Sequence, residues 1–148
     1  MKVALITGGL GLIGTFISKQ LLKEKLVNKV VCLDNFGRYT KSIEKDFEDF
    51  RKYRIDYVGK KVIIERGDCK HSTVVSKILL KYKPYYIFHL AALPLAKLDN
   101  LNSEEALEGT VISTTNILEG IAAMKYRPKK FVYASSSMVY GDFKKQTI

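Results

Sequence analysis

A glycine-rich turn near the start of the chain has the residue types and spacing that bind a pyrophosphate. Gly8, Gly11 and Gly14 recur at every third position within the segment Thr7–Gly14. Residues without a side chain let backbone N–H groups approach an anion closely, and a helix that opens at Leu12 and Ile13 would direct its positive end at that anion. The turn therefore predicts dinucleotide binding, with a turn that only allows close helix–sheet packing as the alternative.

An acidic residue follows at the distance expected of a ribose ligand. Asp34 stands 20 residues after Gly14 and ends a short apolar run. A carboxylate there can accept hydrogen bonds from both ribose hydroxyls of the adenosine half, and it would repel a 2′-phosphate. We therefore expect NAD as the cofactor. NADP stays open as the cofactor because Arg38, near in sequence, could bind a 2′-phosphate. For Asp34 itself, the other interpretation is a turn or capping role.

Strand and helix patterns alternate along the whole chain and would position these residues. Apolar runs predict strands over residues 2–7, 29–33, 62–65, 86–90 and 131–134. Apolar stripes predict helices between them, and the stripes are Ile13, Phe16, Ile17 and Leu21; Ile43, Phe47, Phe50 and Tyr53 or Arg54; Val75, Ile78, Leu79 and Tyr82; and Leu107, Val111, Thr114, Leu118 and Ile121. This alternation predicts an α/β fold with a doubly wound, Rossmann-like parallel sheet and ligands at the carboxyl ends of its strands.

Composition indicates one folded domain. The chain has 148 residues, of which 47% are hydrophobic and 27% charged, and no apolar run is long enough to span a membrane. Cys32 and Cys69 belong to no metal-ligand or disulfide pattern, so we expect buried thiols and no metal site. The net charge of +10 is compatible with several anionic partners, but mixed charges along residues 41–61 are typical of a solvated helix. We expect a cytoplasmic protein without a membrane or a specific nucleic acid as partner.

Six short motifs in order give the chain a family resemblance. They are the segments Thr7–Gly14, Leu33–Asn35, Gly67–Asp68, His89–Ala92, Asn116–Glu119 and Ser135–Gly141. With these motifs the chain resembles the amino-terminal part of the extended short-chain dehydrogenase/reductase family, the NAD-dependent nucleotide-sugar epimerases and dehydratases. The resemblance covers nearly all 148 residues.

The resemblance implies a role for each matching residue. Asp34 and Asn35 would bind the adenosine ribose, and Asp68 and Cys69 the adenine. Other residues would complete the cofactor path, namely Leu90, Ala91 and Ala92 along its middle and Ser135 and Ser136 near the nicotinamide ribose. Ser137 would be the catalytic hydroxyl that hydrogen-bonds the substrate alcohol, while a tyrosine polarised by a lysine removes its proton and hydride passes to the nicotinamide.

The chain departs from the family pattern after Ser137. The family's Tyr-x-x-x-Lys lies on a helix well downstream. Residues Tyr140 to Lys144 have the same residue spacing but not this position, and Gly141 between them is unfavourable to a helix. We therefore expect residues 1–148 to be a truncated NAD-binding Rossmann domain, with a sheet incomplete on its carboxyl-terminal side, no substrate domain and no activity alone. Thr110, Ser113 and His71 replace family residues, which predicts changed local contacts in an intact fold.

Two functions from different classes follow. The first is the NAD-binding portion of an epimerase or dehydratase that works by transient hydride transfer, takes a nucleotide sugar in its full-length form and could form a homo-oligomer. The alternative is a non-catalytic dinucleotide-binding or interaction module that self-associates or binds a partner over uncovered apolar surface. Both histidines are interpreted as structural, His89 in the core and His71 in a loop or at a helix start.

Overall fold

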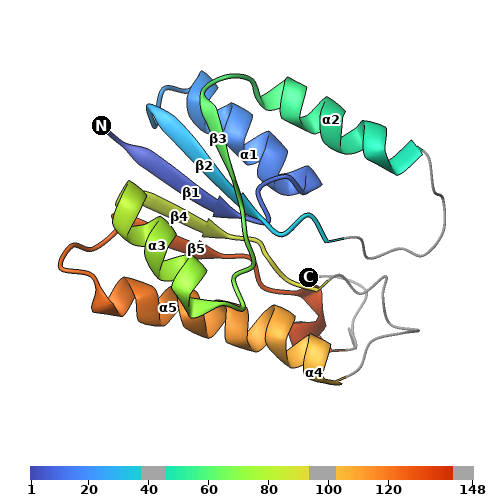
Figure 1. The fold of residues 1–148 in the computed structure, drawn as a ribbon, viewed down its shortest axis with the longest axis vertical. Coiled ribbons are helices and arrows are strands. Elements are labelled where there is room, and N and C mark those ends of the chain that lie inside the picture. Colours follow the sequence, from blue (N-terminus) through green and yellow to red (C-terminus); the bar gives the residue numbers. More distant parts are fainter. Residues whose placement is uncertain (38–45, 94–102, 142–148) are drawn as a thin grey trace.

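The computed structural model describes residues 1–37, 46–93 and 103–141 of the chain. Within these residues one parallel sheet has helices on both of its faces (Figure 1). None of the described helices is both long enough and apolar enough to cross a lipid bilayer.

The sheet contains five strands in the order β3-β2-β1-β4-β5. Their bounds are Val3–Thr7 for β1, Lys29–Asp34 for β2, Val62–Arg66 for β3, Tyr86–His89 for β4 and Lys130–Tyr133 for β5. Every neighbouring pair is parallel, which confirms the predicted doubly wound sheet. The strand order reverses between β1 and β4, and open sheets of this kind bind ligands at such a reversal.

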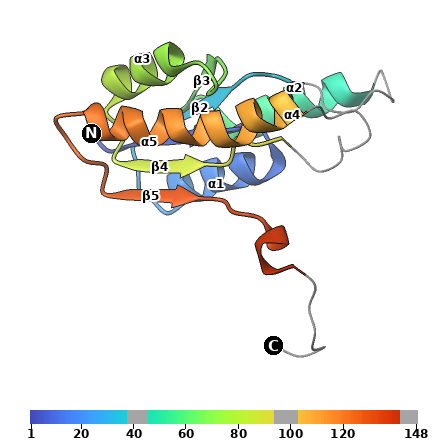
Figure 2. The same ribbon diagram turned by 90° about the horizontal axis from the view of Figure 1, so that it is seen from below.

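The helices form two layers. Their bounds are Leu12–Lys23 for α1, Asp46–Val58 for α2, Ser72–Tyr82 for α3, Ser103–Ala106 for α4, Leu107–Ile112 for the π-helical η2, Ser113–Ala123 for α5 and Ser137–Tyr140 for the 3₁₀ turn η3. Leu21 of α1 and Ile55 of α2 pack on one side of the sheet, and Leu79 of α3 and Ile117 of α5 on the other. In Figure 2, α1 and α5 flank the sheet and η3 projects away from it. The predicted stripe at residues 43–54 lies partly outside the described residues.

The buried strand β1 divides the core in two. Val3 and Leu5 face the cluster with α3 and α5, whereas Ala4 and Ile6 face the cluster with α1. Because successive side chains of a strand point to opposite faces, a strand covered on both faces must be apolar throughout, as β1 is.

The predicted apolar face of α1 is wrong at its first half. Leu21 is buried as expected, but Ile13 and Phe16 are exposed, and the helix instead turns Gly14 and Ser18 inward. A Cβ on Gly14 would lie 2.8 Å from the carbonyl oxygen of Gly8, so only glycine allows this approach. Small residues therefore bring the first half of α1 against the turn, and the side chains of Ile13 and Phe16 remain outside.

The long segment before β5 is helical as predicted, but its buried face is different. Ile117 and Ser113 are buried, whereas Leu107, Val111 and Leu118 are exposed. Polar contacts accompany the shift, since the hydroxyl of Thr114 points inward to His89 and buried Ser113 Oγ donates to the carbonyl of Gly109 at 2.9 Å. Of the predicted stripe, Leu107, Val111 and Leu118 thus lie at the surface, whereas Thr114 contacts His89 and Ile121 packs against the core.

His89 is a buried structural residue, as the sequence predicted. Thr7 Oγ1 lies 2.6 Å from its Nδ1 and accepts hydrogen bonds from the N–H groups of Leu90 and Ala91. Because two N–H groups occupy the acceptor positions of the Thr7 hydroxyl, its proton is donated to Nδ1. Nε2 therefore carries the ring proton and donates to Thr114 Oγ1 at 3.1 Å. Burial lowers the pKa of His89 to about 4.

We predict that His89 stays neutral far below the usual pH of histidine titration. The chain has two histidines, so His71→Gln leaves His89 as the single imidazole to follow by NMR. Between its folded pKa of about 4 and its ordinary value of 6.5, the unfolded chain binds more protons. The free energy of unfolding should thus be highest above pH 6.5 and fall by up to about 3 kcal/mol as the pH is lowered through this window. A native-state midpoint near 6.5 would contradict the buried tautomer.

We further predict that Gly14→Ala destabilises the fold more than Gly120→Ala. A Cβ at Gly14 meets backbone atoms 2.8 Å away, whereas at Gly120 it meets the flexible end of Leu79 at 2.6 Å. Backbone cannot move aside cheaply, so Gly14→Ala should lower the free energy of unfolding by about 2 kcal/mol or more in urea denaturation. Equal losses in the two variants would show that the turn can relax.

Candidate functional site

The residues singled out in the sequence follow the carboxyl ends of the five strands. Along the sheet order, Asp68 and Cys69 follow β3, Asp34 ends β2 before Asn35, and the glycine-rich turn follows β1. Leu90 to Ala92 then follow β4, and Ser135 to Ser137 follow β5. Because the strands are parallel, these segments form a row at one end of the sheet, where the arrowheads point in Figure 1.

The glycine-rich turn presents backbone at its surface. Gly8 has φ +64, and a Cβ there would lie 3.1 Å from the backbone nitrogen of Ala91, so the turn lies directly against the segment after β4. Gly11 is the N-cap of α1 and offers no side chain to its N–H groups. The first N–H groups of a helix have no partner within it, so this end of α1 can accept an anion. The side chains of Leu12 and Ile13, the first residues of α1, are exposed.

Asp34 is tied to the glycine-rich turn. Its Oδ2 accepts the N–H of Leu10 at 3.0 Å and its Oδ1 accepts the N–H of Phe36 at 2.9 Å. Each carboxylate oxygen can accept more than one hydrogen bond, so both retain capacity for further hydroxyl donors. The carboxylate therefore has the turn role that the sequence predicted as one alternative, and it retains acceptor capacity beside the turn.

The ends of β2 and β3 are joined by side chains. Asn35 Nδ2 donates to Asp68 Oδ2 at 3.0 Å, and Asp68 Oδ1 accepts the N–H of Lys70. Cys69 is buried and its carbonyl accepts Asn116 Nδ2 at 2.9 Å. Burial raises the pKa of the Cys69 thiol to about 12 and that of Cys32 to about 11, so both are neutral core side chains. Cys69 thus has its backbone, and not its thiol, near the row.

Helix α2 supplies a contact that the sequence did not reveal. Arg54 Nη1 donates to the carbonyl oxygen of Leu10 at 3.1 Å, while the N–H of Leu10 is held by Asp34. The peptide groups on both sides of Leu10 are thereby fixed by charged side chains. Arg54 is 44 residues from Leu10, and no local pattern could predict the pair.

The segment after β4 is positioned by Thr7. The N–H groups of Leu90 and Ala91 both donate to its hydroxyl at 3.2 Å, which holds this segment against the glycine-rich turn. Ala92, the next residue, is exposed. Thr7 and His89 were part of recognised motifs, but only the packed structure shows that they form one hydrogen-bonded unit.

The segment after β5 lies at the outer end of the row. Ser135 and Ser136 are exposed, and Ser137 is the first residue of η3. Tyr140 ends η3 and is exposed, whereas Lys144 lies outside the described residues. Among the described residues, no group of three metal-ligating side chains occurs.

The row can bind an extended anion but holds few reactive side chains. It offers backbone N–H groups at one helix start, carboxylate acceptors at its β2–β3 end and hydroxyls at its β5 end. This order matches what a dinucleotide needs: ribose acceptors, a pyrophosphate cradle and polar groups beyond it.

Comparison with known proteins places the chain in a family. The family model described as GDP-mannose 4,6 dehydratase matches residues 5–148. A bifunctional UDP-glucose and UDP-xylose 4-epimerase of Pisum sativum is 29% identical over 93% of this chain and 37% of its own length. A UDP-N-acetyl-alpha-D-glucosaminuronate decarboxylase of Bacillus cytotoxicus is 32% identical over 95% of this chain and 38% of its own length.

Solved structures agree. UDP-glucose 4-epimerase from Bifidobacterium longum, in complex with NAD+ and UDP, superposes with a TM-score of 0.72 and 26% identity over 99% of this chain and 41% of that chain. The chain thus spans about two fifths of the length of these relatives. Its fold, its motif order and these matches show that the chain belongs to the NAD-dependent epimerase/dehydratase family, the extended short-chain dehydrogenase/reductases, and corresponds to the amino-terminal part of its members.

Proposed function

We propose that residues 1–148 bind NAD along the carboxyl ends of the five strands. The observation that carries this proposal is the Leu10 peptide, whose N–H is held by Asp34 at 3.0 Å, because it fixes the ribose acceptor and the pyrophosphate turn as one rigid unit. A preformed site of this kind loses little conformational entropy when its ligand binds. NAD in the complex of the Bifidobacterium longum relative supports the choice of ligand.

Each half of the dinucleotide has residues suited to it. The adenosine ribose is bound by Asp34, with Asn35 and Asp68 beside it, and the backbone of Cys69 faces the adenine. The pyrophosphate is bound by the backbone of Gly8, Gly11, Leu12, Ile13 and Gly14. The nicotinamide half passes Leu90, Ala91 and Ala92 and reaches Ser135 and Ser136.

NAD is preferred over NADP because of charge at the ribose. A 2′-phosphate beside Asp34 would meet a carboxylate. Arg66 lies opposite Asp34 in the strand register and its guanidinium lies 5.7 Å from the centre of the Phe36 ring. Arg38, the residue that left NADP open, lies outside the described residues.

The chain is further proposed to be the cofactor-binding portion of an enzyme that acts on a nucleotide sugar. Bound NAD supplies a hydride acceptor, and the hydroxyl of Ser137 hydrogen-bonds the substrate alcohol so that it is oriented toward the nicotinamide. The names of the relatives support epimerisation or dehydration of a nucleotide sugar as the reaction class.

One observation favours the second candidate, a module that self-associates. Leu107, Val111 and Leu118 are exposed on the helical segment η2–α5, although their spacing is that of a buried stripe. An exposed apolar stripe of this kind is typical of an interaction surface. Self-association is compatible with NAD binding and replaces the enzymatic role only if NAD does not bind.

Calorimetric titration with NAD, NADP and ADP-ribose tests the cofactor proposal. We expect NAD and ADP-ribose to bind with similar affinity and NADP more weakly. Asp34→Ala should weaken NAD binding by about 10- to 100-fold, since hydrogen bonds to a charged group contribute about 1.5–3 kcal/mol. Asp56→Asn, an exposed carboxylate on α2, is the matched control and should leave affinity unchanged. Failure of all three ligands to bind the folded chain would contradict the proposal and leave the interaction module.

Replacement of Ser137 tests the catalytic assignment in a longer protein that carries this region. Ser137→Ala should lower kcat by about 100-fold or more and change NAD affinity by less than about 2-fold, because the hydroxyl acts on the substrate. Ser76→Ala, at an exposed position of α3, is the control. Unchanged turnover in Ser137→Ala would remove this residue from the mechanism.

A further inference from the structure

The net charge of the chain is concentrated at the amino ends of the strands, opposite the cofactor row. Five short segments meet there: residues 1–2, 23–29, 59–61, 83–85 and 124–130. They contain eleven of the 25 lysines and arginines of the chain and one of its 15 acidic residues, Glu24. The remaining fourteen basic and fourteen acidic residues balance, so these segments account for the whole excess of +10.

Backbone hydrogen bonds show that the segments adjoin one another. The N–H of Val30 donates to Lys61, the N–H of Asn28 to Lys2, and the N–H of Lys129 to Tyr85, which itself donates to Val3. With strands about 4.8 Å apart, five strand starts form a row roughly 19 Å long. We call this the basic surface, and its cations are Lys2, Lys23, Lys25, Lys29, Lys60, Lys61, Lys83, Lys125, Arg127, Lys129 and Lys130.

The cations of the basic surface are available to a partner. All eleven side chains are exposed, and within the described part of the chain none lies in a salt bridge. Arg127 donates to the carbonyl of Ile121, and Lys2 lies over the ring of Tyr85. Lysines at helix ends are common because the negative end of the helix attracts them. That effect falls off within the last turn of a helix, so it does not explain the lysines at or next to the strand starts, namely Lys2, Lys29, Lys61 and Lys130.

Two of these lysines occupy positions that favour glycine. Lys25 and Lys83 have φ 54 and 43 and follow α1 and α3. The N–H groups of Lys25 and Leu26 close the end of α1 by bonding to Leu22 and Leu21, an arrangement in which glycine is the usual residue. A residue with a side chain is strained in this conformation. The lysines are therefore placed there despite a conformational cost.

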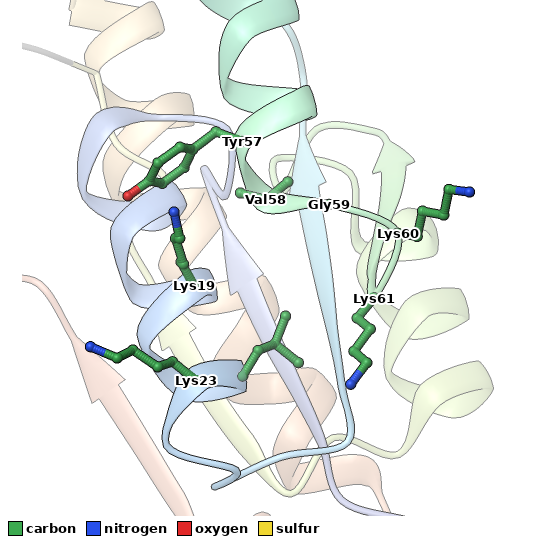
Figure 3. A pocket seen from close by; sticks show the side chains of 8 residues that line it. Lys19, Lys23, Tyr57, Val58, Gly59, Lys60 and Lys61 are labelled. Carbon is green, nitrogen blue, oxygen red and sulfur yellow. The ribbon is translucent and has the colours of Figure 1, made fainter.

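Apolar groups accompany the charges. Leu26 is 48% exposed in the loop between Lys25 and Lys29. A separate hollow of about 340 Å³ is lined by Leu22, Val58 and the three lysines Lys23, Lys60 and Lys61. Figure 3 shows these lysines around it. A broad basic face with an exposed leucine suits the surface of a bilayer better than a nucleic-acid groove, since the helices α1, α2, α3 and α5 all end here and present no N-terminus to a phosphate.

We propose that the basic surface binds the surface of a membrane that contains anionic phospholipids. Each lysine near such a membrane adds to the attraction, and this attraction needs no ordered pocket. Exposed, scattered cations bind a small molecule weakly. Over an extended charged surface, their individual attractions sum. The carboxyl ends of the strands, on the opposite side, stay open to the solvent. This proposal replaces the expectation from sequence that no membrane is a partner.

Vesicle co-sedimentation tests the proposal with the 148-residue chain. It should bind vesicles of phosphatidylglycerol and phosphatidylcholine, bind pure phosphatidylcholine vesicles hardly at all, and dissociate as salt is raised. Lys29→Glu with Lys61→Glu should lower partitioning by about 10-fold or more. Lys52→Glu with Lys77→Glu, exposed on α2 and α3, makes the same change in net charge and should lower it by less than about 3-fold.

Two further arms decide between partners. Leu26→Ser should weaken vesicle binding by about 3-fold or more, because it removes an apolar group from the bilayer interface. A 20-base-pair DNA duplex is titrated at the same salt. If the chain binds the duplex more tightly than the vesicles, and Leu26→Ser does not change duplex binding, the membrane proposal is wrong and the partner is a nucleic acid. If the two double lysine variants lose vesicle partitioning equally, the membrane proposal is also wrong, because net charge alone would then account for the binding. Circular dichroism confirms that each variant is folded, and NAD binding at the opposite end is measured separately.

Discussion

The close approach of the turn after β1 to its neighbours on both sides is the constraint on which the structure depends. Gly8 lies against the backbone of Ala91, and a Cβ on Gly9 would lie 2.6 Å from the side chain of Cys32. Gly14 then allows α1 to begin beside the same turn. A larger residue at these positions would press against neighbouring atoms, so α1 and the turn would pack less closely on the strand ends.

Polar groups around this turn convert close packing into a fixed geometry. Asp34 and Arg54 hold the peptides of Leu10, and Thr7 holds the segment after β4 while it donates to His89. Each hydrogen bond contributes modestly, but their loss would leave buried polar atoms without partners. A site whose walls are held in this way is formed before a ligand arrives.

Much of the fold and of the candidate site could be predicted from sequence, because both depend on patterns between residues that are close along the chain. Glycine spacing, strand runs and the position of Asp34 predicted the sheet and the order of the site segments, and strand bounds agreed within two residues. Hydrophobic periodicity failed at Ile13, Phe16, Leu107 and Val111, where small or polar residues face inward instead. Arg54 and the basic surface escaped prediction because they depend on which segments the fold brings together. Net charge was known from composition, but its location follows only from topology.

The separation of charge has a consequence for how the molecule behaves in solution. Ten units of net positive charge lie at one end of the strands and a balanced mixture lies elsewhere, so the chain has a large electric dipole moment along the strand direction. Such a molecule turns in an external field as it approaches a charged body. It therefore meets an anionic surface with the same end first. The electric field of the surface orients the molecule before any short-range contact is made.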